Sequence, residues 1–306
     1  RFAFMNLEGV GFETLEIATL PTEDRWILAR LSRTIQRLHD ELSRYRYSAS
    51  IKLLRDFFWD SLCDWYIELT KARMIGGERG AEAKQVLAFC LDQILRLLHP
   101  FVPFITERLW RQLNDVAPRR GLPGLAEPTV DGLLIASAFP PPDGWPALAD
   151  EGIVSVFESL QAVTRGVRDL RGKNNVPPKQ AVTVTINAPL EKIEALREQA
   201  NIICRMANVG TLNVGSESDR PKNAGTAVVE SLRIYVHDIS DDAKERVRLE
   251  KELAGVEKQI VGKEAKLGNE KFVQHAKPEV VAAERGRLDA LRSLRATLTE
   301  DLSLIG

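Results

Sequence analysis

The chain has 306 residues, of which 44% are hydrophobic and 28% charged, values typical of a soluble globular protein with roughly two domains or more. Its formal net charge of -1 excludes a general attraction to nucleic acid, so any RNA binding must come from local patches. No apolar run approaches the roughly 20 residues of a membrane span, the N-terminus lacks a secretory signal, and the few cysteines form no Cys-x-x-Cys pair for zinc. We therefore expect a cytoplasmic protein without a membrane partner and, because the chain begins without Met, a part of a longer protein.

Residues 1–20 predict an extended connector, because short apolar pieces are interrupted by Gly9 and Gly11. Four helical patterns follow, each with an apolar face at helical spacing: residues 23–45, 48–74, 81–99 and 104–116. The second pattern is the most aromatic stretch of the chain, and four of its residues are expected in the core: Phe58, Leu62, Trp65 and Leu69. Long helices with short links predict an antiparallel helix bundle over residues 21–117.

Residues 118–150 are rich in Pro and Gly, and we expect an irregular connector that packs on the bundle surface. Residues 151–238 predict a small α+β module, which starts with a helix over 151–171. The alternation of Val182, Val184 and Ile186 with threonines then predicts a half-buried strand. One short helix and three more strands complete the module: the helix at 190–200 and the strands at 211–215, 227–230 and 232–237.

Over residues 239–306 the apolar residues recur in steps of three and four, with a break near 268–278. Two apolar seams around a central turn predict an antiparallel coiled-coil hairpin, so the fold class is mainly α with one small α+β module. Gly255, Gly262 and Gly286 each cost roughly 1 kcal/mol in a helix interior. We therefore expect this C-terminal arm to be mobile.

The chain shows no catalytic constellation. It has no Gly-rich phosphate loop, no His-Glu-x-x-His motif and no Gly-x-Ser-x-Gly motif, and its four histidines lie in separate elements. A carboxylate row, Asp56, Asp60, Asp64 and Glu68, repeats every fourth residue of the aromatic helix. Carboxylates need further ligands or a cleft to hold a metal, so we expect these acids to face arginines or solvent, and RNA to lie elsewhere. We predict no catalytic residue, metal or cofactor in this chain.

One local patch is basic and lies around the end of the 151–171 helix, with Asp169 as its only acid. Its members are Arg165, Arg168, Arg171, Lys173 and Lys179, with Asn174 and Asn175 as further donors. Two hypotheses stay open: a helix C-terminus whose cations suit the helix dipole, or a corner that contacts phosphates. In the arm, glutamates balance the cations, so charge alone favours a structural or protein-binding role, and RNA contact requires cations gathered on one face.

Several strings resemble one enzyme family. Three strings resemble the anticodon-binding helix bundle of the class I aminoacyl-tRNA synthetases for branched aliphatic amino acids: EDRWILARL, RYRYSASIKLLRDFFWDSLCDWYIELTKARM and LLHPFVPFITERLW. Two strings resemble the module after the bundle and the C-terminal coiled coil of valyl-tRNA synthetases: VRDLRGKNNVPP and LEKELAGVEKQIVGKEAKLGNEKFVQHAKPEVVAAERGRL. One departure is Lys277, which is inserted between Ala276 and Pro278 and puts the register of the coil turn in doubt.

The resemblance implies that the parent enzyme joins valine to its tRNA with ATP and magnesium. The ATP-site signatures of the family, of the His-Ile-Gly-His and Lys-Met-Ser-Lys-Ser type, do not occur in this sequence. The chain is then a non-catalytic part, a monomer that binds valine-specific tRNA and no DNA, with the bundle at the anticodon and the arm at the outer corner. The expected tRNA contacts form three groups: Arg1, Phe4, Asn6, Lys71 and Arg73 near the anticodon; Arg168, Arg171, Lys173 and Asn174 at the basic corner; and Arg246, Arg248 and Lys251 on the arm.

Two alternatives stay open. A fragment of an isoleucyl or leucyl enzyme is the nearest, although the isoleucine enzyme more often ends in a cysteine-rich zinc module, whose Cys-x-x-Cys pairs are absent here. A helical coiled-coil scaffold that docks proteins and binds no RNA also fits the balanced charge. An independent enzyme fits least, because no catalytic motif is present.

Overall fold

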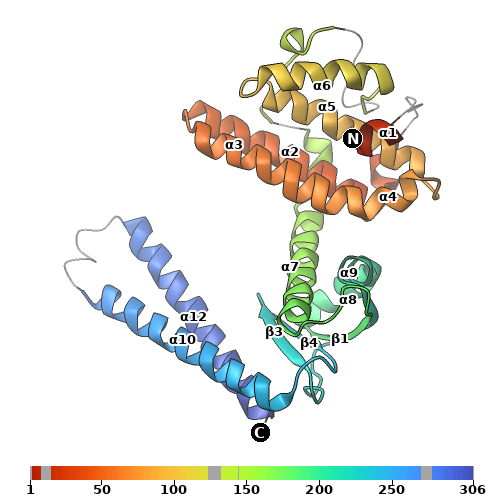
Figure 1. Ribbon diagram of the computed structural model, residues 1–306. Coiled ribbons are helices and arrows are strands. Elements are labelled where there is room, and N and C mark those ends of the chain that lie inside the picture. The colour runs from red at the N-terminus through yellow and green to blue at the C-terminus, as the bar shows by residue number, and fades with distance from the viewer. Residues whose placement is uncertain (1, 8–14, 123–131, 144, 270–277, 306) are drawn as a thin grey trace. The chain divides into compact units, whose positions relative to one another are not determined.

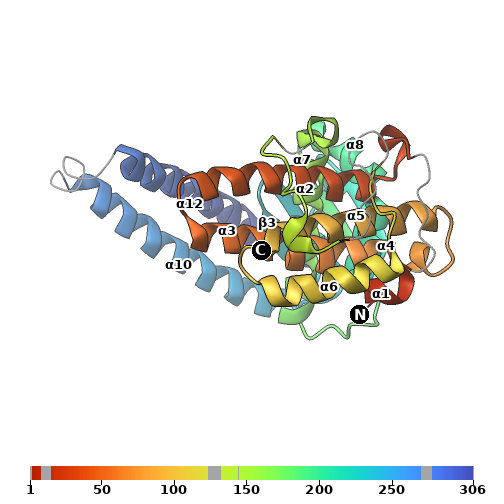
Figure 2. The same cartoon turned by 90° about the horizontal axis from the view of Figure 1, so that it is seen from above.

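Figures 1 and 2 show the computed structural model, which describes residues 2–7, 15–122, 132–143, 145–269 and 278–305. The chain divides into two compact units, unit 1 (residues 1–157) and unit 2 (residues 158–306). The fold is mostly helical and contains one small four-stranded sheet, as the helical and alternating patterns predict. Within the described residues, no helix is both long enough and apolar enough to cross a membrane.

Unit 1 consists of helices joined by irregular segments. Its elements are α1 (Phe2–Asn6), η1 (Ile17–Thr19), α2 (Thr22–Ser43), α3 (Tyr47–Arg55), η2 (Asp56–Ile67), α4 (Glu68–Met74), α5 (Gly80–Leu98), α6 (Pro103–Val116), η3 (Leu134–Ala136), η4 (Pro146–Leu148) and the first part of α7 (Glu151–Lys173). The extended connector predicted for residues 1–20 is wrong at its start, where α1 is helical. Ala3 and Leu7 recur at a spacing of four residues and are buried, which favours a helix there.

Helix α2 begins after Pro21 and carries Glu23 and Asp24 in its first turn, as acids near a helix N-terminus predict. Helical spacing predicts an apolar face of six residues, of which Leu42 is half-buried and five are buried: Trp26, Ile27, Leu31, Ile35 and Leu38. The Trp26 ring stacks on the Phe157 ring with 4.4 Å between centroids. Burial of large side chains along a 22-residue helix makes α2 the central element of the unit 1 core.

Helices α3, η2 and α4 form one continuous helix whose middle, Asp56–Ile67, has π-helical turns. The predicted helix over 48–74 is confirmed in extent, although its middle has π-helical rather than α-helical turns. A π turn bonds residue i to residue i+5, yet the buried positions still recur in steps of three and four residues: Leu54, Phe57, Ser61, Trp65 and Leu69. Phe57 is buried, whereas Phe58 is only half-buried. The other three predicted core residues are buried: Leu62, Trp65 and Leu69.

The described part of the Pro- and Gly-rich segment packs on the helices of unit 1. Arg120 is fully buried; its Nε donates to Asp92 at 2.8 Å, and its guanidinium carbon lies 4.3 Å from the centroid of the Trp110 ring. Ser32 of α2 accepts from the Trp145 backbone N–H at 3.1 Å and donates to the Trp145 carbonyl at 3.2 Å. Polar groups buried under an irregular segment are thereby satisfied, which allows it to cover the core.

Unit 2 contains a sheet with strand order β2-β1-β4-β3. Its strands are β1 (Val182–Asn187), β2 (Val209–Gly215), β3 (Gly225–Val229) and β4 (Leu232–Val236). Strands β1 and β2 are parallel and need a crossover, which helices α8 (Leu190–Glu198) and α9 (Ala200–Ala207) supply. Strand β4 pairs antiparallel with β1 and β3. The strands lie where alternation predicts them, but the single helix predicted for 190–200 is two helices with Gln199 between them.

Helices α10 (Asp242–Gly268) and α12 (Pro278–Ile305) lie side by side in unit 2 (Figures 1 and 2). The Asp241 side chain caps α10 by accepting from the Ala243 backbone N–H at 3.0 Å. The two helices share an apolar seam of buried and partly buried residues: Leu249, Leu253, Val256, Ile260, Leu267, Leu288, Leu291, Leu294, Leu298 and Leu302. Apolar spacing predicts these residues, while most of the predicted break near 268–278 lies outside the described residues.

A single carboxylate binds cations from both helices of this pair. Glu284 of α12 accepts from Lys263 at 2.6 Å and lies 3.3 Å from the Lys266 ammonium, both on α10, and 3.2 Å from Arg287. Its side chain is 6% exposed. The hydrogen bond from Lys263 lowers the pKa of Glu284, so the charged form is favoured in the folded state.

We predict that acid weakens the helix pair through Glu284. A lowered folded-state pKa stabilises the fold above the ordinary glutamate pKa of about 4.3, and this stabilisation disappears as the pH falls through the folded-state value. Glu284→Gln should speed amide exchange of α10 and α12 at pH 7 and remove most of the acid dependence. Glu264→Gln is the matched control. Glu264 also forms an ion pair, with Arg292 at 2.7 Å, but its side chain is 45% exposed. Equal exchange rates in both variants would contradict the prediction.

Candidate nucleic-acid interface

Arg73 belongs to a buried network in unit 1. It donates to the Glu23 carboxylate at 2.8 Å and to Asp24 at 2.7 Å, and the Tyr66 hydroxyl donates to Asp24 at 2.7 Å. Burial raises the pKa of the Asp24 carboxyl, and the hydrogen bonds from Arg73 and Tyr66 oppose that shift. Because Arg73 is only 15% exposed and donates inward, the structure corrects its predicted role at the anticodon to one in the fold. Arg1, predicted for the same group, lies outside the described residues.

Lys71 is exposed and lies next to α1. Its ammonium pairs with Glu68 at 3.0 Å and lies 5.9 Å from the centroid of the Phe2 ring. Phe4 and Asn6 are half-buried on the same short helix, and the Asn6 side-chain amide donates to the Phe2 carbonyl at 2.8 Å. The structure therefore brings α1 and the last helical turn of α4 together, as the predicted grouping of these residues requires. A cation beside aromatic rings is a suitable surface for nucleotides.

The predicted carboxylate row faces solvent. Asp60, Asp64 and Glu68 are exposed, while Asp56 is half-buried and accepts from Lys52 at 2.5 Å. In the part of the chain that the structure describes, no three or more His, Cys, Asp or Glu residues are grouped to hold a metal ion. Exposed acids repel phosphates, so the side of the helix at Asp60 and Asp64 is unfavourable for RNA, whereas Glu68 is paired with Lys71.

Three side chains of the basic corner at the end of α7 donate hydrogen bonds to backbone carbonyls of unit 2. Arg168 donates to the Met206 carbonyl at 2.9 Å, and Asn174 donates to the Leu170 carbonyl at 2.8 Å. The Arg171 side chain is buried and donates to four backbone carbonyls: those of Pro177, Pro178, Gln180 and Asn208. The buried Arg171 is therefore corrected to a structural role, whereas Arg168 is exposed and Asn174 is half-buried with a second amide proton left, so their phosphate contacts stay predictions. Lys173 is exposed and has no partner among the described residues.

The cations of the helix pair are mostly engaged with neighbours. Arg246 pairs with Glu250 at 3.3 Å, one turn away. Arg248 pairs with Glu252 at 2.7 Å and donates to the Thr226 carbonyl of β3 at 3.0 Å, which ties α10 to the sheet. Lys251 is exposed and has no partner within the described residues. Of the predicted arm contacts, Lys251 is therefore the cation that remains available to phosphates.

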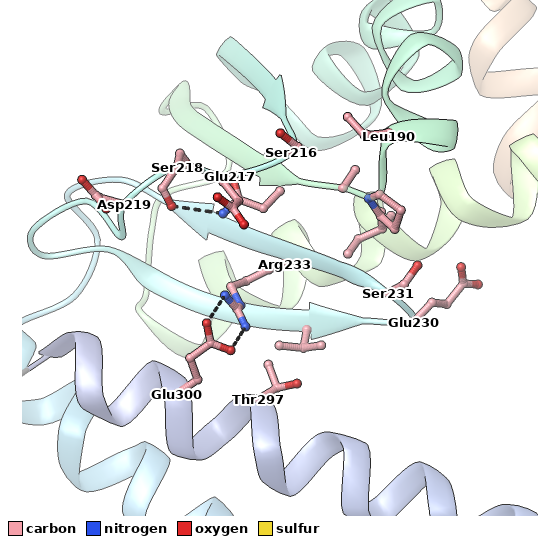
Figure 3. Close-up of a pocket in the computed structure, with 15 residues that line it drawn as sticks. Leu190, Ser216, Glu217, Ser218, Asp219, Glu230, Ser231, Arg233, Thr297 and Glu300 are labelled. Carbon is pink, nitrogen blue, oxygen red and sulfur yellow. Dashed lines mark hydrogen bonds and ion pairs between the residues drawn. The ribbon is translucent and has the colours of Figure 1, made fainter.

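Helix α12 is joined to β4 by a second arginine (Figure 3). Arg233 Nη2 donates to Glu300 at 2.8 Å, and its Nε lies 3.4 Å from the fully buried Asp301. A pocket of about 990 Å³ lies beside this joint. Its charged lining residues are mainly acidic: Glu217, Asp219, Glu230 and Glu300, against Arg233. The excess of carboxylates makes this pocket unfavourable for phosphates.

An exposed basic and aromatic segment that the predicted contacts do not include lies at the junction of α2 and α3: Arg44, Tyr45, Arg46 and Tyr47, the first residue of α3, here called the elbow. All four side chains are exposed. The signal that identifies it is the alternation of Arg and Tyr between two helical patterns, because buried faces of helices do not alternate in this way. Interleaved cations and aromatic rings are typical of surfaces that bind single-stranded RNA.

Comparison with known proteins identifies two families along the chain. Residues 24–186 match the anticodon-binding domain of tRNA ligase, and residues 241–306 match the valyl tRNA synthetase tRNA binding arm. Curated relatives named valine--tRNA ligase include those of Rhodopirellula baltica (33% identical over 99% of this chain), Thermotoga maritima (34% over 97%) and Carboxydothermus hydrogenoformans (35% over 100%). The chain covers 29%, 32% and 33% of these relatives, so it spans about a third of their length.

We predict that Arg73→Met destabilises unit 1 by about 3–5 kcal/mol, because the buried Asp24 carboxylate loses its cation. Urea unfolding followed by circular dichroism measures the loss. Lys71→Met, which removes an exposed ion pair, is the matched control and should change stability by less than about 1 kcal/mol. Adding Asp24→Asn to Arg73→Met should recover part of the stability. A fully stable Arg73→Met variant with impaired RNA binding would show instead that Arg73 faces the ligand.

Proposed function

We propose, because the chain belongs to the valyl-tRNA synthetase family and corresponds to its C-terminal part, that it binds valine tRNA for an enzyme that attaches valine to it. The observation that carries this proposal is the succession of an anticodon-binding domain and a tRNA-binding arm along one chain. The arm and the valine-named relatives disfavour the isoleucyl and leucyl alternatives. They also disfavour a scaffold without an RNA role.

The parent enzyme would use ATP and magnesium to activate valine. This chain's residues do not fit either group, because the ATP-site signatures do not occur in the sequence and the described residues hold no cluster of metal ligands. We therefore assign no catalytic step to this chain. Its part is to hold the tRNA so that the acceptor end reaches the catalytic part of the parent enzyme.

In unit 1, we place the anticodon at the surface formed by α1 and the last turn of α4. Phe4 offers a partly exposed ring for an unstacked base, and Lys71 offers a charge for phosphate. Asn6 uses one amide proton on the Phe2 carbonyl and keeps its second amide proton and its oxygen for a base edge. The helices of this unit would form the antiparallel bundle that their spacing predicts.

In unit 2, the helix pair would be an antiparallel coiled coil that contacts the outer corner of the tRNA. Support for the coiled coil comes from the shared apolar seam and from Glu284, which binds Lys263 of the facing helix. Lys251 is the arm cation proposed to contact phosphates. We further propose a monomeric cytoplasmic protein that binds no DNA, in keeping with its low cysteine content and net charge of -1.

We predict that the chain binds valine tRNA more tightly than the same tRNA with an exchanged anticodon. Fluorescence anisotropy at several salt concentrations measures both affinities. Phe4→Ala should remove discrimination, because stacking on an aromatic ring contributes about 1–3 kcal/mol per base. Lys71→Gln should weaken the binding of both tRNAs equally. It should also reduce the slope of log affinity against log salt by about 1, as expected for a phosphate contact. Lys222→Gln is the matched control, since Lys222 is exposed and lies in unit 2.

Equal affinity for the two tRNAs in the unmodified chain would contradict anticodon recognition by unit 1. An unchanged anticodon preference in Phe4→Ala would leave recognition standing but would move it away from α1. Circular dichroism of each variant confirms that an effect on binding does not arise from unfolding.

A further inference from the structure

The elbow ends helix α2 with a hydrogen-bond pattern that normally calls for glycine. The Tyr45 N–H donates to the Leu42 carbonyl at 2.9 Å, and the Arg46 N–H donates to the Glu41 carbonyl at 2.9 Å. These two bonds form a Schellman motif, in which the residue at the position of Tyr45 adopts a left-handed backbone. Tyr45 has φ of +56°, a conformation in which bulky side chains are rare and glycine is favoured.

Packing in the unit 1 core does not explain a tyrosine at this position. The Tyr45 side chain is 78% exposed, and its ring lies edge-on to that of Tyr47, with 6.5 Å between centroids. Tyr47 is itself 54% exposed. An exposed aromatic ring gains little from burial, yet its backbone is strained. Residues in strained backbone conformations cluster at functional sites, so the elbow is a candidate for binding.

Positive charge is concentrated around this ring. Residues 30–56 contain seven Lys or Arg and three Asp or Glu, whereas the whole chain has a net charge of -1. Arg37 and Arg44 are exposed and have no ion pair among the described residues, and Arg46 lies 3.6 Å from Glu41. A groove of about 430 Å³ is lined by α2, α3 and the start of η2. Its charged lining residues are four cations, Arg30, Arg33, Arg37 and Lys52, and two acids, Glu41 and Asp56.

The elbow is distant from the surface proposed for the anticodon. Helix α2 has 22 residues, which corresponds to a length of about 33 Å at 1.5 Å per residue. Arg73 binds Glu23 and Asp24 at the start of α2, whereas the elbow follows its last residue. Figures 1 and 2 both show the α2–α3 junction at the opposite end of unit 1 from α1 and the end of α4.

We propose that the elbow and the adjacent groove are a second RNA contact of unit 1. Tyr45 stacks on an unpaired base, and Arg37 and Arg44 neutralise the flanking phosphates. RNA fits better than an acidic protein surface, because the strained feature is the exposed aromatic ring and stacking on a base explains it directly. The proposal rests on the tRNA-binding function given above and adds to it a site that the α1 surface does not include.

The test compares variants of the full chain by fluorescence anisotropy on two probes: labelled valine tRNA and an unstructured oligoribonucleotide of about 12 nucleotides, within the site size of single-strand binders. Tyr45→Gly should weaken binding about 5- to 150-fold, the equivalent of one stacked base. Its Tm should stay unchanged or rise, because glycine adopts positive φ without steric strain. Tyr45→Phe keeps the ring and should bind within about twofold of the unmodified chain.

The charge part of the proposal has its own variant. The double change Arg37→Gln and Arg44→Gln should reduce the slope of log affinity against log salt by about 1.4 to 1.8 for two lost phosphate contacts. Phe104→Ala is the matched aromatic control, because Phe104 is 92% exposed on α6 and should leave both affinities unchanged.

The outcomes separate the two claims. Tyr45→Gly binding both probes as tightly as the unmodified chain overturns the second contact while leaving the proposed function intact, and points to a protein partner at the elbow. An unmodified chain that fails to bind valine tRNA overturns the proposed function, and the oligoribonucleotide then decides the elbow alone. Failure to bind either probe overturns both.

Discussion

The buried carboxylate of Asp24 is the constraint on which unit 1 depends. A carboxylate removed from water is strongly unfavourable unless cations and hydrogen-bond donors surround it. Arg73 and Tyr66 meet that requirement at 2.7 Å each, and the Tyr66 hydroxyl also lies 3.2 Å from the Ala83 carbonyl of α5. One buried charge thus joins α2, η2, α4 and α5. The surface at α1 and the end of α4 is held in place by groups that are not themselves available to a ligand.

Elsewhere in the chain, too, buried arginines stabilise the fold while exposed lysines remain available to a ligand. Arg73, Arg120 and Arg171 are mostly or fully buried and donate to carboxylates or carbonyls inside the fold. The planar guanidinium carries five donors, so it satisfies several buried acceptors at once, whereas an ammonium is more strongly hydrated. Outside the elbow, the exposed cations proposed to contact RNA are lysines, Lys71 and Lys251. A cluster of cations in the sequence therefore indicates RNA binding only if those cations are not already bound to acceptors inside the fold.

The elbow reverses this relation between stability and function. At the other sites a functional surface rests on a satisfied network, whereas at Tyr45 the backbone carries strain that glycine would relieve. The two exposed arginines of this region, Arg37 and Arg44, have no ion pair among the described residues, in contrast to the buried Arg73 and Arg120. A tyrosine where glycine would give a more stable fold indicates a role other than folding, because selection for the fold alone does not favour it.

Apolar spacing and alternation in the sequence alone determined the long helices, the four strands and most of the seam between α10 and α12, because burial acts on side chains at a fixed period. They did not reveal α1 or the division between α8 and α9. Motif resemblance likewise led to the enzyme family before any contact was known. Only the tertiary structure decided that Arg73 and Arg171 face inward, that Phe57 is fully buried while Phe58 is half-buried, and that Tyr45 has a left-handed backbone. The reason is that a cation's partners, a turn's hydrogen bonds and a backbone angle depend on atoms from distant segments, which local sequence patterns do not contain.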